Sequence, residues 1–171
     1  MVHSQRFDGI TPEMYEWYSQ NVAELCTKVN DLQKMVVLEQ KGNHQLVHMQ
    51  VKIPAPFVEN RSMVQDMWSE YNPEGKSIYY STTEGNEDKL AQYKDKIPAK
   101  DVICSALGYT SIEGTNKNAA GEFTAVKATL LISIDIAGSM PDMVKEKVSS
   151  NFQFETLEKV MDFIKKHYKK K

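Results

Sequence analysis

The chain has 171 residues, a length that suits one domain and allows roughly two-thirds of the unfolded surface to be buried. Hydrophobic residues make up 41% of it and charged residues 26%, a mixture typical of folded globular proteins and not of disordered or fibrous ones. Because 21 Lys and Arg residues oppose 23 Asp and Glu residues, the net charge is -2, and no basic field exists to attract nucleic acid. We therefore expect a single domain over residues 1–171 without a nucleic-acid partner.

Residues 11–34 are predicted to be helical. Thr11 is suited to cap a helix N-terminus, and Pro12 is suited to the first helical position. Apolar residues then recur every three or four positions, which is the spacing of a helix with one buried face. Asn30 and Asp31 indicate a break. The apolar positions are Met14, Tyr18, Val22, Leu25, Val29 and Leu32.

Residues 35–136 are predicted to form an antiparallel sheet. Two hairpins turn at residues 41–43 and 72–75, which have the residue types of tight turns. A polar, lysine-rich stretch over 84–100 is expected to be a loop with at most a short helix. Two long strands then follow, joined by a polar turn over 113–118. The six predicted strands cover residues 35–40, 47–53, 62–71, 76–83, 102–112 and 123–136.

The C-terminal region over residues 141–168 is predicted to be helical, in one or two parts, after Gly138 and Pro141 end the last strand. Its apolar residues recur at helical spacing and its charged residues fill the other side, so the helix is strongly amphipathic. This layout indicates an α+β domain in which a curved antiparallel sheet wraps around a long C-terminal helix. The apolar positions are Phe154, Leu157, Val160, Met161, Ile164 and Tyr168.

Two segments are similar to segments of the START (steroidogenic-acute-regulatory-related lipid-transfer) domain family. Residues 53–64 contain prolines and then Arg61 ahead of a strand, and residues 135–141 contain Asp, Gly and Pro before the last helix. The resemblance implies the helix-grip fold and the binding, transfer or sensing of a lipid or sterol-like ligand. Ser62 and Met63 stand where the family has Asp and an aromatic residue, so any role of that acid is lost here.

The resemblance also implies that the sheet is incomplete. The family usually has a helix and about three strands before the helix that matches residues 11–34, and this chain has almost nothing there. Because the family's first strand pairs with its last, the 123–136 strand is expected to lie at an open edge, and such an edge invites another chain. We expect either a shortened variant of the family or a protein partner that covers this edge. The alternative function is a non-catalytic structural or accessory subunit of a larger assembly.

A lipid cavity is expected between the sheet and the C-terminal helix, because ligand cavities are mostly apolar with a few polar groups, and methionine suits an adaptable pocket. Arg61 is expected to reach either a ligand headgroup or an acid of the protein. The alternative is that the same apolar residues pack together as a core. The candidate cavity residues are Met49, Arg61, Met67, Cys104, Val126, Leu130, Ile132, Ile134, Leu157, Val160, Met161 and Ile164.

Catalytic and metal-binding motifs do not occur in the sequence. It has no GxSxG, HExxH, GxGxxG or Walker loop, and Cys26 and Cys104 lie far apart without ligand spacing. We therefore predict a protein of a reducing compartment with no enzymatic activity, no cofactor and no metal. An enzyme built on the helix-grip fold is the least supported hypothesis.

The ends of the chain bear on its location. The basic end over residues 165–171 is expected either to touch an anionic membrane transiently or only to satisfy the preference of a last helical turn for cations. The start lacks the apolar region of a secretory signal, and no apolar stretch approaches the ~20 residues of a membrane span. We expect a soluble protein of the cytoplasm, or of an organelle or cytoskeletal assembly reached through a partner.

Overall fold

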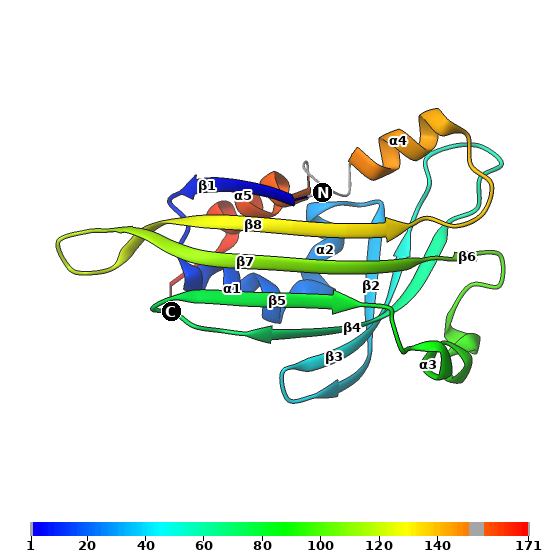
Figure 1. Cartoon of the computed structure of the whole chain (residues 1–171), viewed down its shortest axis with the longest axis horizontal. Helices are drawn as coiled ribbons and strands as arrows, with labels where there is room; N and C mark the ends of the chain where they lie inside the picture. The colour runs from blue at the N-terminus through cyan, green and yellow to red at the C-terminus, as the bar shows by residue number, and fades with distance from the viewer. Residues whose placement is uncertain (1, 151–155, 171) are drawn as a thin grey trace.

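The computed structural model describes residues 2–150 and 156–170 (Figure 1). Its strands are β1 (Val2–Asp8), β2 (Gln33–Lys41), β3 (His44–Val51), β4 (Arg61–Glu70), β5 (Lys76–Thr82), β6 (Val102–Ile103), β7 (Ser105–Lys117) and β8 (Phe123–Asp135). Its helices are α1 (Pro12–Gln20), α2 (Val22–Val29), α3 (Glu87–Gln92), the 3-10 helix η1 (Lys94–Lys96), α4 (Asp142–Ser150) and α5 (Thr156–His167). The strands form one sheet in the order β1-β8-β7-β5-β4-β3-β2, in which β6 lies parallel to β4 and the other pairs are antiparallel.

Two helices occupy the region in which helix was predicted near the N-terminus. Thr11 caps α1 as expected, because its hydroxyl accepts the backbone N–H of Met14 at 3.3 Å. The chain breaks at Asn21 and not first at Asn30, since the Asn21 side chain donates to the carbonyl of Trp17 at 2.7 Å and ends α1. After α2 the chain enters β2 directly.

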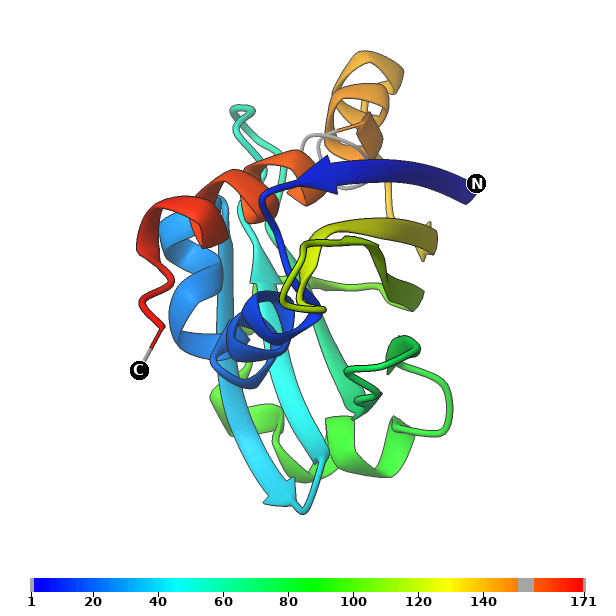
Figure 2. The same cartoon turned by 90° about the vertical axis from the view of Figure 1, so that its left-hand side faces the viewer.

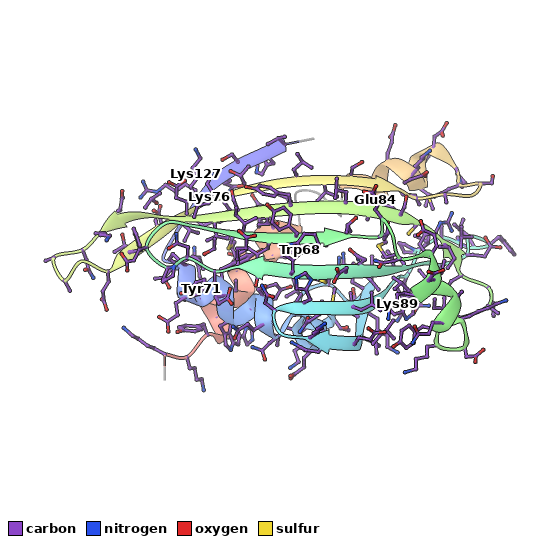
Figure 3. The ribbon with its side chains drawn as sticks, turned by 60° about the horizontal axis from the view of Figure 1, so that its bottom comes forward. Trp68, Tyr71, Lys76, Glu84, Lys89 and Lys127 are labelled. Atoms are coloured by element: carbon purple, nitrogen blue, oxygen red, sulfur yellow. The ribbon has the colours of Figure 1, made fainter. Side chains whose placement is uncertain are left out.

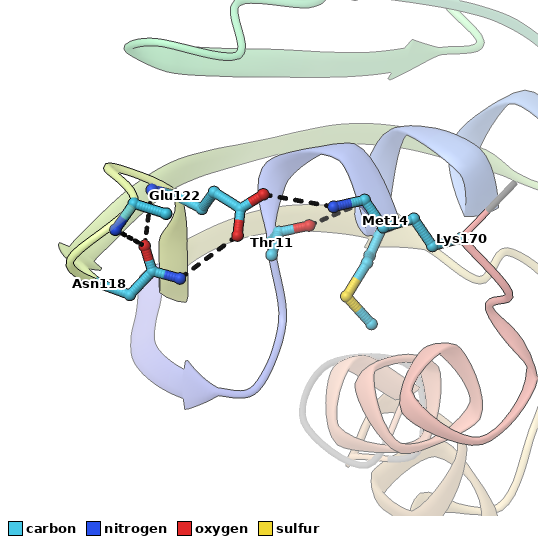
Figure 4. A network of polar contacts seen from close by, with 6 residues as sticks. Thr11, Met14, Asn118, Glu122 and Lys170 are labelled. Carbon is cyan, nitrogen blue, oxygen red and sulfur yellow. Dashed lines mark hydrogen bonds and ion pairs between the residues drawn. The ribbon is translucent and has the colours of Figure 1, made fainter.

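The hairpin of β7 and β8 is longer than the sequence indicated. The turn expected over 113–118 is wrong, because β7 continues to Lys117 and the chain reverses only after it. Asn118 organises the turn: its side-chain oxygen accepts the N–H groups of Ala120 and Glu122, both at 3.0 Å. The Glu122 carboxylate in turn accepts from Asn118 and from Lys170 near the C-terminus, each at 3.3 Å (Figure 4).

The expected open edge at the 123–136 strand is wrong. β1 pairs antiparallel with β8 along its whole length, from Val2 opposite Leu131 to Asp8 opposite Ala125 (Figure 1). The strand was not predicted because Phe7 is the one residue of β1 that is buried, so the segment lacks an apolar alternation. The sheet therefore ends at β1 and β2, and β8 is covered on both sides.

Helices α1, α2 and α5 lie against one face of the curved sheet, which we call the inner face (Figure 2). The first apolar cluster joins this face to α1 and α5 and includes Tyr15, Ile112, Val126 and Ile164. The second cluster lies between the sheet and α4, around Met63, Cys104, Ile136 and Val148. The fold is thus a helix grip whose inner face carries two separate apolar clusters.

The predicted C-terminal helical region contains two helices, α4 and α5, and residues 151–155 between them, with Phe154, lie outside the described residues. On α5 the four residues Leu157, Val160, Met161 and Ile164 are at most 6% exposed, which confirms the amphipathic pattern there. Within residues 2–150 and 156–170, no helix is long and apolar enough to cross a membrane.

Candidate functional site

An apolar pocket lies beneath α4, at the end of the sheet where β2 begins and β3 ends. Its volume is about 200 Å³, below the ~300–1,000 Å³ of typical small-molecule sites. The charged residues among its described lining are two lysines. The apolar lining residues are Leu32, Val51, Pro54, Met143, Val144 and Val148, and the polar ones are Asn30, Gln33, Lys52 and Lys147.

The pocket adjoins the second apolar cluster. Val51 and Val148 belong to both, and Met49 and Met63 lie in the cluster next to them. Methionine side chains are flexible and repack readily around a ligand. Because α4 contributes Val144 and Val148 to the cluster, an outward movement of this helix would enlarge the pocket without breaking the pairing of the sheet.

Arg61 joins the two segments that carry the START resemblance. It is 2% exposed, and its Nε and Nη2 donate to the carbonyls of Ile136 and Ala137 at 2.9 and 3.1 Å. Nη1 donates to the carbonyl of Glu59. The guanidinium therefore donates to backbone carbonyls and not to an acid as one of the two expectations had it, and its contact with a ligand headgroup stays a prediction.

A buried polar network lies on the other face of β3 and β4. His48 Nε2 is 2.9 Å from Ser62 Oγ, and Ser62 donates its hydroxyl to Asp101 at 2.6 Å. Gln50 donates to the same carboxylate oxygen at 2.6 Å. Asp101 thus brings an acid next to Ser62, the position at which the START resemblance implied that an acid was lost. No sequence pattern indicates this contact, because Asp101 lies at the end of a polar loop.

This network is not arranged for nucleophilic catalysis. Ser62 is fully buried, and its proton points to Asp101 and not to a basic imidazole nitrogen. Burial lowers the pKa of His48, so the ring is neutral at physiological pH. The three side chains instead attach the loop that carries Asp101 to the sheet.

Comparison of the sequence finds no matching family model and no matching curated protein. The structure of human STARD10 has a TM-score of 0.69 and 15% identity, covering 97% of this chain but 64% of that one. Human StAR-related lipid transfer protein 5 has a TM-score of 0.70 and 10% identity, covering 98% of this chain and 77% of that one. This chain has a START-like fold. At these identities the similarity establishes the fold alone.

An enzyme also shares the START-like fold. The Zhui aromatase/cyclase from Streptomyces sp. R1128 has a TM-score of 0.55 and 11% identity, covering 96% of this chain and 90% of that one. The fold therefore does not decide between ligand carriage and catalysis. That decision depends on the side chains of this chain.

The START-like fold divides the predicted cavity residues among several places. Ile132 lies opposite Gly108 in neither apolar cluster, and Met67 lines a polar pocket near α1. The predicted cavity residues that lie in the first cluster are Val126, Leu130, Leu157, Val160, Met161 and Ile164. Those of the second are Met49, Cys104 and Ile134.

The first cluster of this START-like fold contains fully buried residues from both the sheet and α5. Ile112 on β7, Val126 on β8 and Ile164 on α5 are each 0% exposed. In the second cluster, burial raises the pKa of the Cys104 thiol to about 11, which leaves it protonated and apolar. The pocket residues that sequence reasoning missed, such as Val51 and Val144, sit at element ends, where no periodic pattern distinguishes a pocket wall from a core.

The polar pocket that contains Met67 has a volume of about 390 Å³. At its wall Tyr79 donates to Glu16 at 2.7 Å, and burial together with this carboxylate raises the pKa of Tyr79. Its lining also includes amide side chains that bond one another, such as Gln45 with Gln40 at 3.0 Å. This chemistry is unsuited to an aliphatic ligand, so the pocket beneath α4 is the better candidate.

Proposed function

We propose that this protein reversibly binds a lipid or sterol-like molecule in the pocket beneath α4. The observation that carries the proposal is the apolar pocket that continues into a methionine-containing cluster. Human StAR-related lipid transfer protein 5, which has the same fold and is named for lipid transfer, supports it. So does the absence of a nucleophile arrangement in the His48, Ser62 and Asp101 network. The proposed role is carriage or sensing of the ligand, without catalysis.

Ligand entry requires α4 to move, because the pocket is smaller than typical ligand sites. Withdrawing Val144 and Val148 from the cluster costs about 1.5–3 kcal/mol for each side chain. A ligand recovers about 0.8 kcal/mol for each methylene group that it buries. The opening of α4 is therefore offset by a ligand that buries about four to eight methylenes, and a ligand that buries fewer than about four does not offset it.

The test is native mass spectrometry of the gently purified protein, followed by titration with lipids of increasing chain length. Val144→Asp places a charge in the pocket wall at a partly buried position and should abolish uptake. Leu107→Asp makes the same kind of change on the opposite face of the sheet, at a residue 48% exposed, and should leave uptake unchanged. Equal uptake by both folded variants would contradict the proposed site.

Transient membrane contact by the C-terminus belongs to the same proposal. Lys165, Lys166, Lys169 and Lys170 are exposed, and each basic residue near an anionic surface contributes about 1 kcal/mol. Vesicles that contain phosphatidylserine should therefore sediment with the protein, and replacement of Lys165 and Lys166 by Gln should weaken this. Binding that is independent of both lipid charge and these lysines would exclude the contact.

A further inference from the structure

The face of the sheet opposite α1, α2 and α5, here called the outer face, carries an apolar row across six strands. Helix α3 lies on the same face beside β2, where Lys89 bonds Glu39. Directly paired residues place His44, Trp68, Tyr80 and Tyr109 side by side on β3, β4, β5 and β7. The row continues through Leu131 on β8 and ends at Val2 on β1. We call these six residues the aromatic row.

The rings of the aromatic row contact one another in sequence: the first three are stacked, and Tyr109 meets Tyr80 edge to face. The ring centroids of His44 and Trp68 are 5.6 Å apart, those of Trp68 and Tyr80 are 4.9 Å apart, and those of Tyr80 and Tyr109 are 5.4 Å apart. Beside the row, Leu107 is 48% exposed. An apolar band of this length on a solvated sheet face is typical of an interaction surface.

Basic side chains lie on one side of the aromatic row. Four residues from it along the strands, Lys76, Glu113, Lys127 and Arg6 are paired across β5, β7, β8 and β1. Because strand residues alternate between faces, all four share the outer face with the row. Figure 3 shows Lys76 and Lys127 together at one end of this face, with Trp68 between them and Glu84 at the other end.

An acidic groove lies on the other side of the aromatic row. It has a volume of about 390 Å³, and its charged lining residues within the described chain are Glu84, Glu87 and Asp135, all exposed. Hydroxyl side chains and Leu107 complete its wall. The groove spans the ends of β5, β7 and β8, which are the strands that carry Lys76, Glu113 and Lys127 at their other ends.

We propose that a second copy of this chain docks on the outer face, with a twofold axis that lies along the aromatic row. Such an axis places each strand antiparallel to the same strand of the second copy. A residue four positions before the aromatic row in one copy then faces the residue four positions after the row in the other. Lys76 then faces Glu84 of the second copy, and Lys127 faces Asp135. Each lysine enters the acidic groove of the other molecule, and symmetry repeats each contact.

The same axis avoids a clash at Glu113, because Glu113 faces Ser105. On β4 it sets Asp66 opposite Glu70, an acidic pair that opposes the contact at this strand. The surface is thus complementary to itself along β5, β7 and β8, which carry most of the contact. Nucleic acid is not favoured, since the groove is acidic and the net charge is -2.

The contact area indicates a weak dimer. Four strands at about 4.8 Å spacing, over about eight residues of about 3.4 Å each, give roughly 500 Å² for each copy. The total of about 1,000 Å² lies at the lower limit of specific interfaces. We therefore expect reversible association, half complete at a concentration on the order of 10–100 µM.

Sedimentation velocity of the full chain, over concentrations from about 1 to 300 µM, tests the proposal. The wild type should form a dimer that dissociates on dilution and in high salt. Lys76→Glu and Glu84→Lys should each weaken the dimer by about tenfold or more, because like charges then meet twice across the interface. Combining both substitutions in one chain should restore the dimer, since opposite charges face each other again.

A matched control has the same charge change on the other side of the molecule. Lys166→Glu on α5, behind the inner face, should leave the dimer unchanged. A wild type that stays monomeric at the highest concentration overturns the proposal. So does a dimer that the exchange of Lys76 and Glu84 does not affect, or a monomer that uses this face only for a different protein.

Discussion

Arg61 should be the most stability-sensitive charged residue of this chain. Replacing it by Met keeps much of the aliphatic volume but removes three hydrogen bonds to backbone carbonyls. A hydrogen bond from a charged group is worth about 1.5–3 kcal/mol, and buried carbonyls left unpaired add to the loss. Part of this loss is offset because the Met variant no longer has to remove a charged guanidinium from water when it folds. We expect Arg61→Met to lower the free energy of unfolding by about 3–5 kcal/mol.

Urea unfolding measures this loss directly. A domain stabilised by ~5–15 kcal/mol would lose a large share of its stability, with the midpoint shifted by about 2 M for an m-value of about 2 kcal/mol/M. The m-value itself should stay unchanged. Arg6→Met is the matched control, because Arg6 is 51% exposed and pairs with Asp8 on the surface, so its loss should change stability by less than about 1 kcal/mol.

The result that would refute this reasoning is specific. If Arg61→Met unfolds within about 1 kcal/mol of the wild type but no longer binds lipid, Arg61 serves a ligand headgroup and not the backbone. Hydrogen exchange gives an independent check, because the variant should expose the amides of residues 136–140, which Arg61 holds against the sheet.

Three further predictions concern stability. Burial lowers the pKa of His48 in the folded chain, so on acidification the unfolded chain takes up this proton at a higher pH than the folded chain does. The free energy of unfolding should therefore be unaffected by His48 above pH ~6.5 and should fall below it, as urea unfolding across pH would show. Gly138→Ala should lower the free energy of unfolding by about 1–2 kcal/mol, because φ is 71° there and the added Cβ would lie 3.3 Å from Val102 Cγ1. Thermal unfolding measures this loss. Tyr79→Phe should cost about 1 kcal/mol through the lost bond to Glu16, and an unchanged melting temperature would contradict this.

Local patterns in the sequence predicted most of the regular structure. The capping residue Thr11, the tight turn at 72–75 and the amphipathic spacing of α5 each depend on neighbouring residues, so each could be predicted without the fold. The turn after β7 was placed too early, because residues 113–118 are all polar or small and the pattern does not show which of them reverses the chain. The structure shows that Asn118 does so, through bonds to the N–H groups of Ala120 and Glu122.

The candidate site was harder to predict from the sequence than the helices and strands were. Apolar strand and helix faces were correctly identified as buried, but a pattern cannot separate a packed core from a pocket wall. The α5 face closes on Ile112 and Val126, whereas the pocket depends on Val144 of α4 and Val51 at the end of β3. Arg61 stood out in the sequence through the START resemblance, but its carbonyl partners at Ile136 and Ala137 are distant in sequence and could not be predicted from it.

β1 shows how tertiary pairing overrides a weak local pattern, and removing it tests that argument. Deleting residues 1–8 takes the 8%-exposed Phe7 from the first cluster, at about 1.5–3 kcal/mol, and exposes the edge of β8. The long, apolar β8 should then recruit other chains. Light scattering should show aggregation of the shortened chain, and Phe7→Ala in the full chain should lose similar stability without aggregating. A shortened chain that remains monomeric and equally stable would show that β1 contributes little to the sheet.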